Sequence, residues 1–467
     1  MNKEAMISIF LLSSFAASVS AQDAFDLLRK GDIPALKALI EKTPALATAK
    51  NADGQTLLHL AVYGKSPALI DFLIDKGAKT EEKDARFKTP LHLAAMNDRR
   101  EVAAALLDAG FAPGAADRFG WTPLHYAARD GRTEAARILV ERGAPIDARN
   151  IAGQTAYNVA QERKMDPAAR LMAEKGADTS AARFPVLKGD YLGQKAPGLK
   201  PEIFAPGVVS TEKKELNSVF TPDGREFYFT IQEPPRGWTI MVMKREADIW
   251  TKPRPADFSG TWSDVDHFLS PDGRTMYFCS NRPLDGKGAT QNNFDIWMVE
   301  RRGDGWSEAR NMGAPINSPE NEFYPSVAKD GTMVFQSWRA GSAGGRDIYQ
   351  SRLVDGAYKT AEGVGPPIST DLAEGDALIS PDGDFIILSV ERPDELGAGD
   401  LCVSFRGKDG SWSEPRNMGG EINTKANENC PIISPDGKFL FYTSAGDIYW
   451  VSVKIIDDLR PGRKEKT

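Results

Sequence analysis

The chain has 467 residues, enough for two or more domains with cores of their own, and its composition is that of an ordinary globular protein. It carries a formal net charge of −7, with a sequence pI near 5.4. That balance argues against a general nucleic-acid binder, whose affinity rests on clustered lysines and arginines that neutralise phosphates. We therefore expect no nucleic-acid partner.

Residues 1–21 have the pattern of a secretory signal peptide. Lys3 precedes an apolar run over residues 6–17, and small residues lead to a cleavage site after Ala21. We expect a periplasmic or secreted protein that begins at Gln22. The apolar run is too short to span a bilayer comfortably and no other run approaches the required length, so we expect no membrane span.

Residues 22–180 repeat with a period of 33. Thr56, Thr89, Thr122 and Thr155 mark the period, and each heads a short segment such as TPLHLA at residues 89–94. A second apolar helical segment that ends in Gly-Ala follows in three of these repeats. The segments resemble the ankyrin repeat, whose period and T-P-L-H-x-A signature they reproduce. The resemblance implies an all-α solenoid of five helix pairs with β-turn fingers, in which the first and last pairs act as caps.

Three of the four histidines, His59, His92 and His125, stand at the signature position of these repeats. In the ankyrin family this ring bonds neighbouring backbone between repeats, so we expect a structural role. His267 is then the one histidine left in the chain. Histidine charge relays and histidine-rich metal sites are therefore nearly excluded.

Ankyrin stacks usually bind protein on the concave face formed by the finger tips and the first helices. The family's variable positions fall here on several aromatic and arginine side chains, which interface hot spots prefer. For Phe119 and Trp121 an alternative stays open, namely that they pack on the adjacent finger. The expected protein-binding positions are Ala52, Asp53, Gln55, Tyr63, Arg86, Lys88, Met96, Arg118, Phe119, Trp121 and Arg129.

Residues 181–200 lose the helical period and gather Pro and Gly, so we interpret them as a linker. Residues 201–455 then hold five copies of a hairpin signal, in which Pro-Asp-Gly or a close variant separates two apolar runs. The copies centre on Gly224, Gly273, Gly331, Gly383 and Gly437, which are 49, 58, 52 and 54 residues apart. This spacing is typical of propeller blades.

The hairpin repeats resemble WD40-like propeller repeats of the TolB type over roughly residues 203–453, with Lys329 in place of proline in one copy. The TolB type looks six-bladed, so six blades stay possible. The last copy supplies three strands, and residues 202–207 are a candidate for its fourth. We therefore predict an all-β five-bladed propeller whose two ends share one blade, which removes open sheet edges. Residues 456–467 are expected to form a charged tail.

An acidic residue stands nine positions before each hairpin glycine, at the start of the expected innermost strand. We expect these acids to ring one mouth of the central channel. They are Glu215, Asp264, Glu322, Glu374 and Glu428. Two positions further along lie Asn217, Asp266, Tyr324, Asp376 and Cys430, which should share the same strand face because side chains alternate with a period of two.

These acids allow three interpretations. The favoured one is ion pairing with Arg282, Arg339 and Arg392, which stand at the end of the second strand. The second is a site for Ca²⁺ or a cationic ligand, because hard cations prefer clustered oxygens. The third is catalysis, since five-bladed propellers include glycosidases that use paired carboxylates, and Asp266, Glu322 and Asp376 would be the candidates. The repetition of the acids by blade favours a structural role.

The three cysteines, Cys279, Cys402 and Cys430, show no CxxC spacing and are expected to be small buried residues, although one pair could oxidise in an exported protein. Taken together, the sequence predicts an exported, non-enzymatic protein-binding or scaffold protein with protein partners and with no cofactor or metal. The alternatives are a carbohydrate-active enzyme, or a receptor for Ca²⁺ or a small cationic or carbohydrate ligand at the propeller mouth.

Overall fold

The computed structural model describes residues 20–461, apart from 65, 236, 343 and 393–396. The chain divides into two compact units, residues 1–185 and residues 186–467. The predicted signal peptide lies outside the described residues except for its last two positions. Ser20 caps the first helix, and Ala21 begins it.

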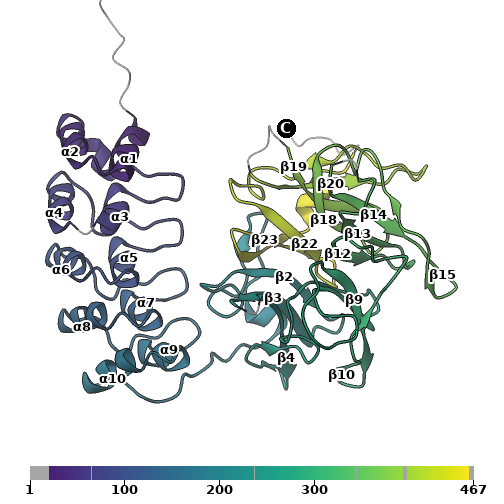
Figure 1. The fold of residues 1–467 in the computed structure, drawn as a ribbon, viewed down its shortest axis with the longest axis horizontal. Helices are drawn as coiled ribbons and strands as arrows, with labels where there is room; N and C mark the ends of the chain where they lie inside the picture. Colours follow the sequence, from purple (N-terminus) through teal and green to yellow (C-terminus); the bar gives the residue numbers. More distant parts are fainter. Residues whose placement is uncertain (1–19, 65, 236, 343, 393–396, 462–467) are drawn as a thin grey trace, which may run out of the picture. The chain divides into compact units, whose positions relative to one another are not determined.

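The first unit is a stack of five helix pairs (Figure 1). In Figure 1 the odd-numbered helices α1 to α9 form one row and the even-numbered helices form the other. The helices are α1 Ala21–Lys30, α2 Ile33–Lys42, α3 Leu57–Ala61, α4 Pro67–Asp75, α5 Pro90–Met96, α6 Arg100–Asp108, α7 Pro123–Arg129, α8 Thr133–Glu141, α9 Ala156–Glu162 and α10 Asp166–Glu174. Two 3₁₀ turns, Pro44–Thr48 and Val62–Gly64, complete the stack.

The signature Thr and His residues fix where each first helix begins. The backbone N–H of Thr89 donates to Nδ1 of His92 at 3.0 Å, so the proton of the neutral ring lies on Nε2. Nε2 then donates to the carbonyl oxygen of Trp121 in the next repeat, also at 3.0 Å. His59 and His125 make the equivalent bonds. The histidines therefore link one repeat to the next.

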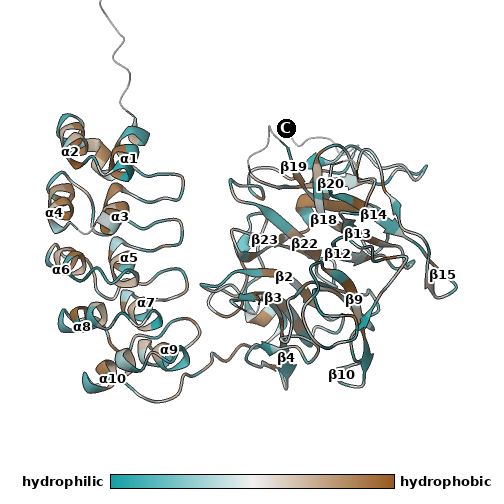
Figure 2. Ribbon diagram, in the orientation of Figure 1, coloured by the Kyte–Doolittle hydropathy of each residue, from teal (hydrophilic) through white to brown (hydrophobic). Residues whose placement is uncertain are grey.

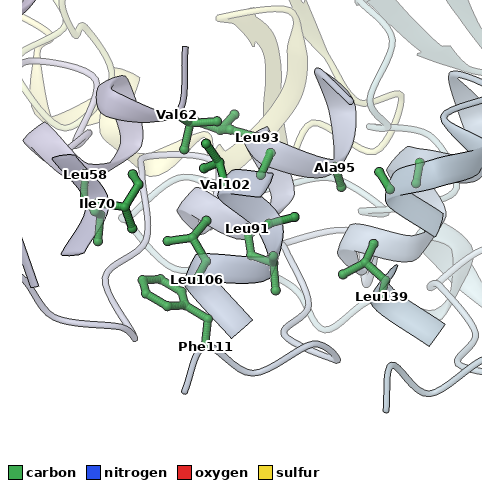
Figure 3. Packing of buried hydrophobic residues seen from close by; sticks show 14 of the residues in the cluster. Leu58, Val62, Ile70, Leu91, Leu93, Ala95, Val102, Leu106, Phe111 and Leu139 are labelled. Carbon is green, nitrogen blue, oxygen red and sulfur yellow. The ribbon is translucent and has the colours of Figure 1, made fainter. Parts of the chain in front are cut away.

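The core of this unit is a continuous row of buried Leu, Ile, Val and Ala side chains between the two rows of helices. Figure 3 shows Leu58 and Ile70, and then Leu91 and Leu106, pointing toward one another from paired helices. Small residues such as Ala94 and Ala127 let neighbouring pairs approach closely. The stack therefore buries one apolar face of each helix against the next pair.

The second unit consists of five antiparallel sheets, which we call blades I to V. Blade I holds β2 Glu215–Phe220, β3 Glu226–Glu233, β4 Gly237–Glu246, β5 Ile249–Trp250 and β6 Arg254–Pro255, and blade II holds β7 Asp264–Leu269, β8 Thr275–Ser280, β9 Asp295–Arg302, β10 Gly305–Trp306 and β11 Arg310–Asn311. Blade III holds β12 Glu322–Val327, β13 Met333–Ser337, β14 Asp347–Ser351 and β17 Glu362–Gly363, with a side hairpin of β15 Leu353–Val354 and β16 Ala357–Tyr358. Blade IV holds β18 Ala373–Ile379, β19 Phe385–Glu391, β20 Asp400–Phe405 and β21 Arg416–Asn417, and blade V holds β22 Glu428–Ile433, β23 Phe439–Ser444, β24 Asp447–Ser452 and β1 Glu202–Ile203. The fold is a five-bladed propeller, and the six-bladed possibility is wrong. Figure 2 shows hydrophobic residues concentrated on the strands of the blades.

Each predicted hairpin turn is present between the first and second strands of a blade. Gly273 adopts φ 72°, in the left-handed region that side chains disfavour, and its N–H donates to the Ser270 carbonyl at 2.8 Å. The carboxylate of Asp272 holds the turn by accepting from the hydroxyl of Ser270 at 2.6 Å. The copy with Lys329 forms the same turn, with Gly331 at φ 85°.

The two ends of the propeller share blade V, as the sequence predicts. Ile203 in β1 pairs with Tyr449 in β24. The next residue, Phe204, is fully buried, and its ring lies 5.1 Å from that of Phe441 and 5.3 Å from that of Phe227. The closure therefore combines strand pairing with an aromatic core that joins blades V and I.

Two connecting segments pack on the propeller. Tyr191, inside the predicted linker, contacts the rings of Phe220 and Phe439 at 5.2 and 5.0 Å. The predicted charged tail begins later than residue 456, because Lys454–Asp458 form helix α11 with Ile456 buried beneath it. Burial of Ile456 anchors this short helix to the propeller. Residues 462–467 lie outside the described residues.

Candidate functional site

The fingers of the helical unit are the turns before each first helix, with turn residues 51–54, 84–87, 117–120 and 150–153. An Asp or Asn opens each turn and accepts backbone N–H groups. In the second finger, Oδ1 of Asp84 accepts from the N–H of Arg86 at 2.9 Å and from that of Lys88 at 2.8 Å. These bonds fix the backbone from which Arg86 and Lys88 project.

The predicted protein-binding residues divide into exposed and buried groups. Tyr63 is 47% exposed, and Ala52, Asp53 and Arg86 are also exposed. Gln55 and Met96 are half-buried, and Met96 packs against the core. The exposed group can contact a partner directly.

Phe119 and Trp121 are 3% and 7% exposed, contrary to the expectation that they contact a partner. They pack with Tyr126 and Val159 in a second small core. The carboxylate of Asp117 orients this cluster by accepting from the Tyr126 hydroxyl at 2.7 Å. These aromatic residues therefore form a buried platform below the surface.

Cations cover that aromatic platform. Lys88 Nζ lies 4.8 Å from the centre of the Tyr126 ring, and Cζ of Arg129 lies 4.9 Å from the same ring. Arg118 lies 4.8 Å from the ring of Phe119. Cations over aromatic faces are attracted by the ring quadrupole. The aromatic rings thus fix the positions of Lys88, Arg118 and Arg129, which are three of the predicted protein-binding residues.

The five acids expected to ring the channel mouth are buried inside their own blades. Glu322 is representative: it accepts from the backbone N–H of Ser318 at 2.9 Å and from the hydroxyl of Ser337 at 2.8 Å. The exposed fraction is 0–1% for all five: Glu215, Asp264, Glu322, Glu374 and Glu428. Each carboxylate is thus bonded within its blade, which agrees with the favoured interpretation of acids satisfied by neighbouring side chains and not with a site for an exposed cation.

Two of the predicted arginine partners pair with these acids. Arg282 donates to Asp264 at 2.6 Å, and Arg339 donates to Glu322 at 3.3 Å. Arg392 is half-buried just after β19. In blade I, burial raises the pKa of Glu215 to about 8 even though Thr211 donates to its carboxylate. Through these hydrogen bonds and ion pairs, the acids attach the start of each innermost strand to the rest of its blade.

The residues that converge on the channel are those two positions further along. Each innermost strand has a β-bulge there, and one residue takes a left-handed conformation with φ between 46° and 52°. The five are Asn217, Asp266, Tyr324, Asp376 and Cys430. The hydroxyl of Tyr324 in blade III donates to the carbonyl of Pro431 in blade V. We call these five residues the bulge ring.

Asp266 and Asp376 are the two carboxylic acids of the bulge ring. Burial raises the pKa of both, and the negative charge of Asp376 raises the pKa of Asp266 further. Two buried carboxyls that repel each other favour a state with at least one proton between them. Glu322 points instead into its blade, onto Ser318 and Ser337, so the three catalytic candidates do not form one group.

A comparison with known families identifies the repeats of the first unit. Residues 25–117 and 109–183 match the sequence model for ankyrin repeats in three copies. These helix pairs are ankyrin repeats. Among curated proteins, no match to the chain is found. Ankyrin repeats are protein-interaction modules, and the cations above the Tyr126 platform lie on the fingers and first helices of this ankyrin unit.

Sequence reasoning missed Phe87 in the second ankyrin finger. Phe87 is 54% exposed and has φ 62°, whereas the equivalent positions of the other three fingers hold Gly54, Gly120 and Gly153. The signal was present, because these four residues are each 33 apart in the sequence. We call the surface formed by Tyr63, Arg86, Phe87, Lys88, Arg118 and Arg129 the finger face.

Other kinds of site find less support. Within the described residues, no helix is long and apolar enough to cross a membrane. In the same part of the chain, no group of three His, Cys, Asp or Glu residues is placed to hold a metal ion. All three cysteines are buried, Cys430 within the bulge ring.

Proposed function

We propose that the protein binds another protein through the finger face of its ankyrin unit and acts as a binding or scaffold protein. The observation that carries this proposal is that the first-helix and finger segments expose Tyr63 and Arg86 and also carry cations that rest on a buried aromatic platform. Tyrosine and arginine dominate the energetics of protein interfaces. A rigid platform lowers the entropy lost when such side chains are fixed on binding.

The propeller serves in this proposal as a second rigid body of the scaffold. Its buried acids bond serines, threonines and arginines of their own blades, which is a structural use. Catalysis at the channel would need a carboxylate that reaches substrate. The test is a glycoside-substrate screen with the wild-type chain and with Asp266→Asn and Asp376→Asn. Hydrolysis that both variants abolish would replace the scaffold proposal with the enzymatic one.

Export belongs to the same proposal and rests on the pattern of residues 1–21. We propose that the mature chain works in the periplasm or outside the cell. A chain without residues 1–21 should stay in the cytoplasmic fraction after osmotic shock, while the full chain should be released. Equal distribution of the two chains would remove the proposal of export without affecting the binding proposal.

The binding proposal is tested by affinity capture with the full chain and with a double variant, Tyr63→Ala with Arg86→Ala. Both side chains are exposed, so their removal should leave the fold intact. A matched control replaces Asp71→Ala on the exposed side of α4. We expect a captured protein that the double variant loses and the control retains. Capture that is equal for all three chains would contradict binding at the finger face.

A further inference from the structure

The second ankyrin finger has a backbone that its sequence does not favour. Position 87 lies in the left-handed region at φ 62°, where the other fingers use glycine at φ 71°, 76° and 75°. A bulky aromatic residue rarely adopts this conformation, and such outliers gather at functional sites. The Phe87 ring is not used by the core, because it stays 54% exposed. The ring contacts Lys83, whose ammonium lies 5.7 Å from the ring centre.

Lys88 follows directly, and its ammonium group makes no direct ion pair with the described residues, although the carboxylates of Asp84 and Asp117 lie near enough to act on its charge. Its Nζ lies over the Tyr126 ring, and no carboxylate of the described residues lies within ion-pair distance of it. Burial lowers the pKa of Lys88 and the neighbouring charge of Arg86 lowers it further, while the carboxylates of Asp117 and Asp84 oppose part of this shift. A half-buried ammonium beside a second cation is favourable for an incoming anionic group.

The carboxylates around Lys88 are already engaged. Asp84 accepts backbone N–H groups of its own finger, and Asp117 accepts the Tyr126 hydroxyl. Asp130 takes two hydrogen bonds from Arg129, each of 2.7 Å. Over residues 83–88, 117–121 and 129–130 the charged side chains are the cations Lys83, Arg86, Lys88, Arg118 and Arg129 and the acids Asp84, Asp117 and Asp130. This patch is net positive in a chain whose net charge is −7.

We propose that the finger face binds an acidic peptide segment, in which a carboxylate pairs with Lys88 and a neighbouring apolar side chain packs on Phe87. This inference rests on the proposed protein-binding function and specifies the chemistry of the partner. Charge complementarity selects the acidic residue, and the exposed aromatic ring at a fixed backbone position selects the apolar neighbour. Phe87 and Lys88 are consecutive residues of the second finger, so a peptide bound across this finger would lie next to both.

The test uses a displayed library of random 12-residue peptides selected on the full chain. Selected peptides are synthesised and titrated by fluorescence anisotropy against the wild type, Lys88→Gln and Phe87→Gly. Lys42→Gln is the matched control, because Lys42 is an exposed lysine at the end of α2. We expect enrichment of Asp or Glu next to an apolar residue. Lys88→Gln should weaken binding at least about tenfold at low salt and less at high salt, because charge pairs are screened by salt.

Phe87→Gly separates a binding role from a structural one. Glycine suits φ 62°, so the Tm of the ankyrin unit should stay unchanged or rise, while affinity for the selected peptides falls by about tenfold. A fall in Tm together with unchanged affinity would show that Phe87 is structural and would overturn its part in the inference. Lys42→Gln should bind as the wild type does.

The outcomes distinguish the inference from the function beneath it. Selected peptides without an excess of carboxylates, but lost on Tyr63→Ala, would overturn the acidic-segment inference and leave protein binding at the finger face standing. Peptides insensitive to every finger-face variant, or a selection without binders, would count against both. Tight binding of a single-stranded RNA probe that Lys88→Gln abolishes would replace the peptide with a nucleic acid.

Discussion

The backbone N–H of Cys430 in blade V donates a hydrogen bond of 3.1 Å to Oδ2 of Asp376 in blade IV. The same pattern recurs between blades III and II, where Asp266 accepts from the backbone of Tyr324. Side chains of the bulge ring therefore hold the backbone of the next blade. The left-handed residues thus make contacts that join the innermost strands of different blades around the channel.

We expect the bulge ring to make the stability of the propeller fall as pH rises. The pKa values of Asp266 and Asp376 are raised in the folded protein, so protonation favours the fold. The contribution is complete below the unfolded pKa of about 4 and is lost as pH rises through the folded values. Thermal unfolding followed by tryptophan fluorescence should show a lower Tm at pH 9 than at pH 5.

Asp266→Asn should reduce that pH dependence, because an amide removes one of the two repelling charges while keeping the side-chain shape. A remainder should persist, since the pKa of Glu215 is also raised, to about 8. Asp304→Asn, on an exposed loop position after β9, is the control and should follow the wild type. A pH dependence of the Tm that is equally steep in Asp266→Asn and in the wild type would show that another group is responsible.

The ankyrin unit should respond to pH in the opposite direction. Burial lowers the pKa of His92 to about 3 and that of His125 to about 4. A depressed histidine pKa means that stability is present above the unfolded value of about 6.5 and is lost as pH falls toward the folded value. The loss is about 2 kcal/mol for His92 at pH 5. Circular dichroism at 222 nm, which reports the helices, measures this loss in urea titrations.

The last repeat supplies a natural control for the histidine effect. There Asn158 takes the histidine position, accepting from the N–H of Thr155 at 3.0 Å and donating to the carbonyl of Ser180 at 2.7 Å. His92→Asn should therefore keep a capping bond but lose its titration. We expect lower stability at pH 7 and a smaller loss between pH 7 and pH 5. An unchanged loss in the variant would contradict the assignment to His92.

Phe204 should be the main apolar residue of the propeller closure. It is fully buried against Phe227, Phe441 and Trp450 at ring distances of 5.1–5.3 Å. Phe204→Ala should cost about 3–5 kcal/mol of unfolding free energy, because the cavity lies between the first and last blades. Val186→Ala, at a strongly exposed position, should change stability by less than about 0.5 kcal/mol. Guanidinium titrations followed by fluorescence compare the two, and equal midpoints would contradict this role.

Trp121→Ala should lower the stability of the ankyrin unit, and any loss of partner binding should follow from that loss of stability. The side chain is buried with Phe119 and Tyr126, so truncation should cost about 3–5 kcal/mol in the ankyrin unit. A urea titration followed at 222 nm measures this cost. A variant that keeps wild-type stability yet loses a partner would restore Trp121 to the binding surface.

The repeats made the architecture predictable from the sequence. Equal spacing of Thr89 and Thr122 fixed the helix pairs, and the hairpin glycines fixed the blades, including the strand at Ile203 that closes the fifth. A periodic pattern carries this information because each repeat makes the same local structure. Helix α11 was missed because its charged residues outweigh one buried apolar residue, Ile456.

The sites were less predictable, because they depend on backbone conformation and on what covers each side chain. Asn217, Tyr324 and Cys430 share one left-handed bulge, and their residue types have nothing in common that would reveal it. Alternation along a strand therefore misplaced the acids relative to the bulge ring. Trp121 has the residue type of an interface hot spot, but its neighbours bury it.

Photo-crosslinking tests the central claim, binding of a protein at the finger face, most directly. A benzoylphenylalanine residue replaces exposed Tyr63 in one full-length chain and exposed Asp71 on α4 in another. Irradiation in the cell compartment where the protein resides should give a discrete crosslinked protein from position 63 and not from position 71. A crosslink from position 71 alone, or no crosslink from position 63, would contradict the claim.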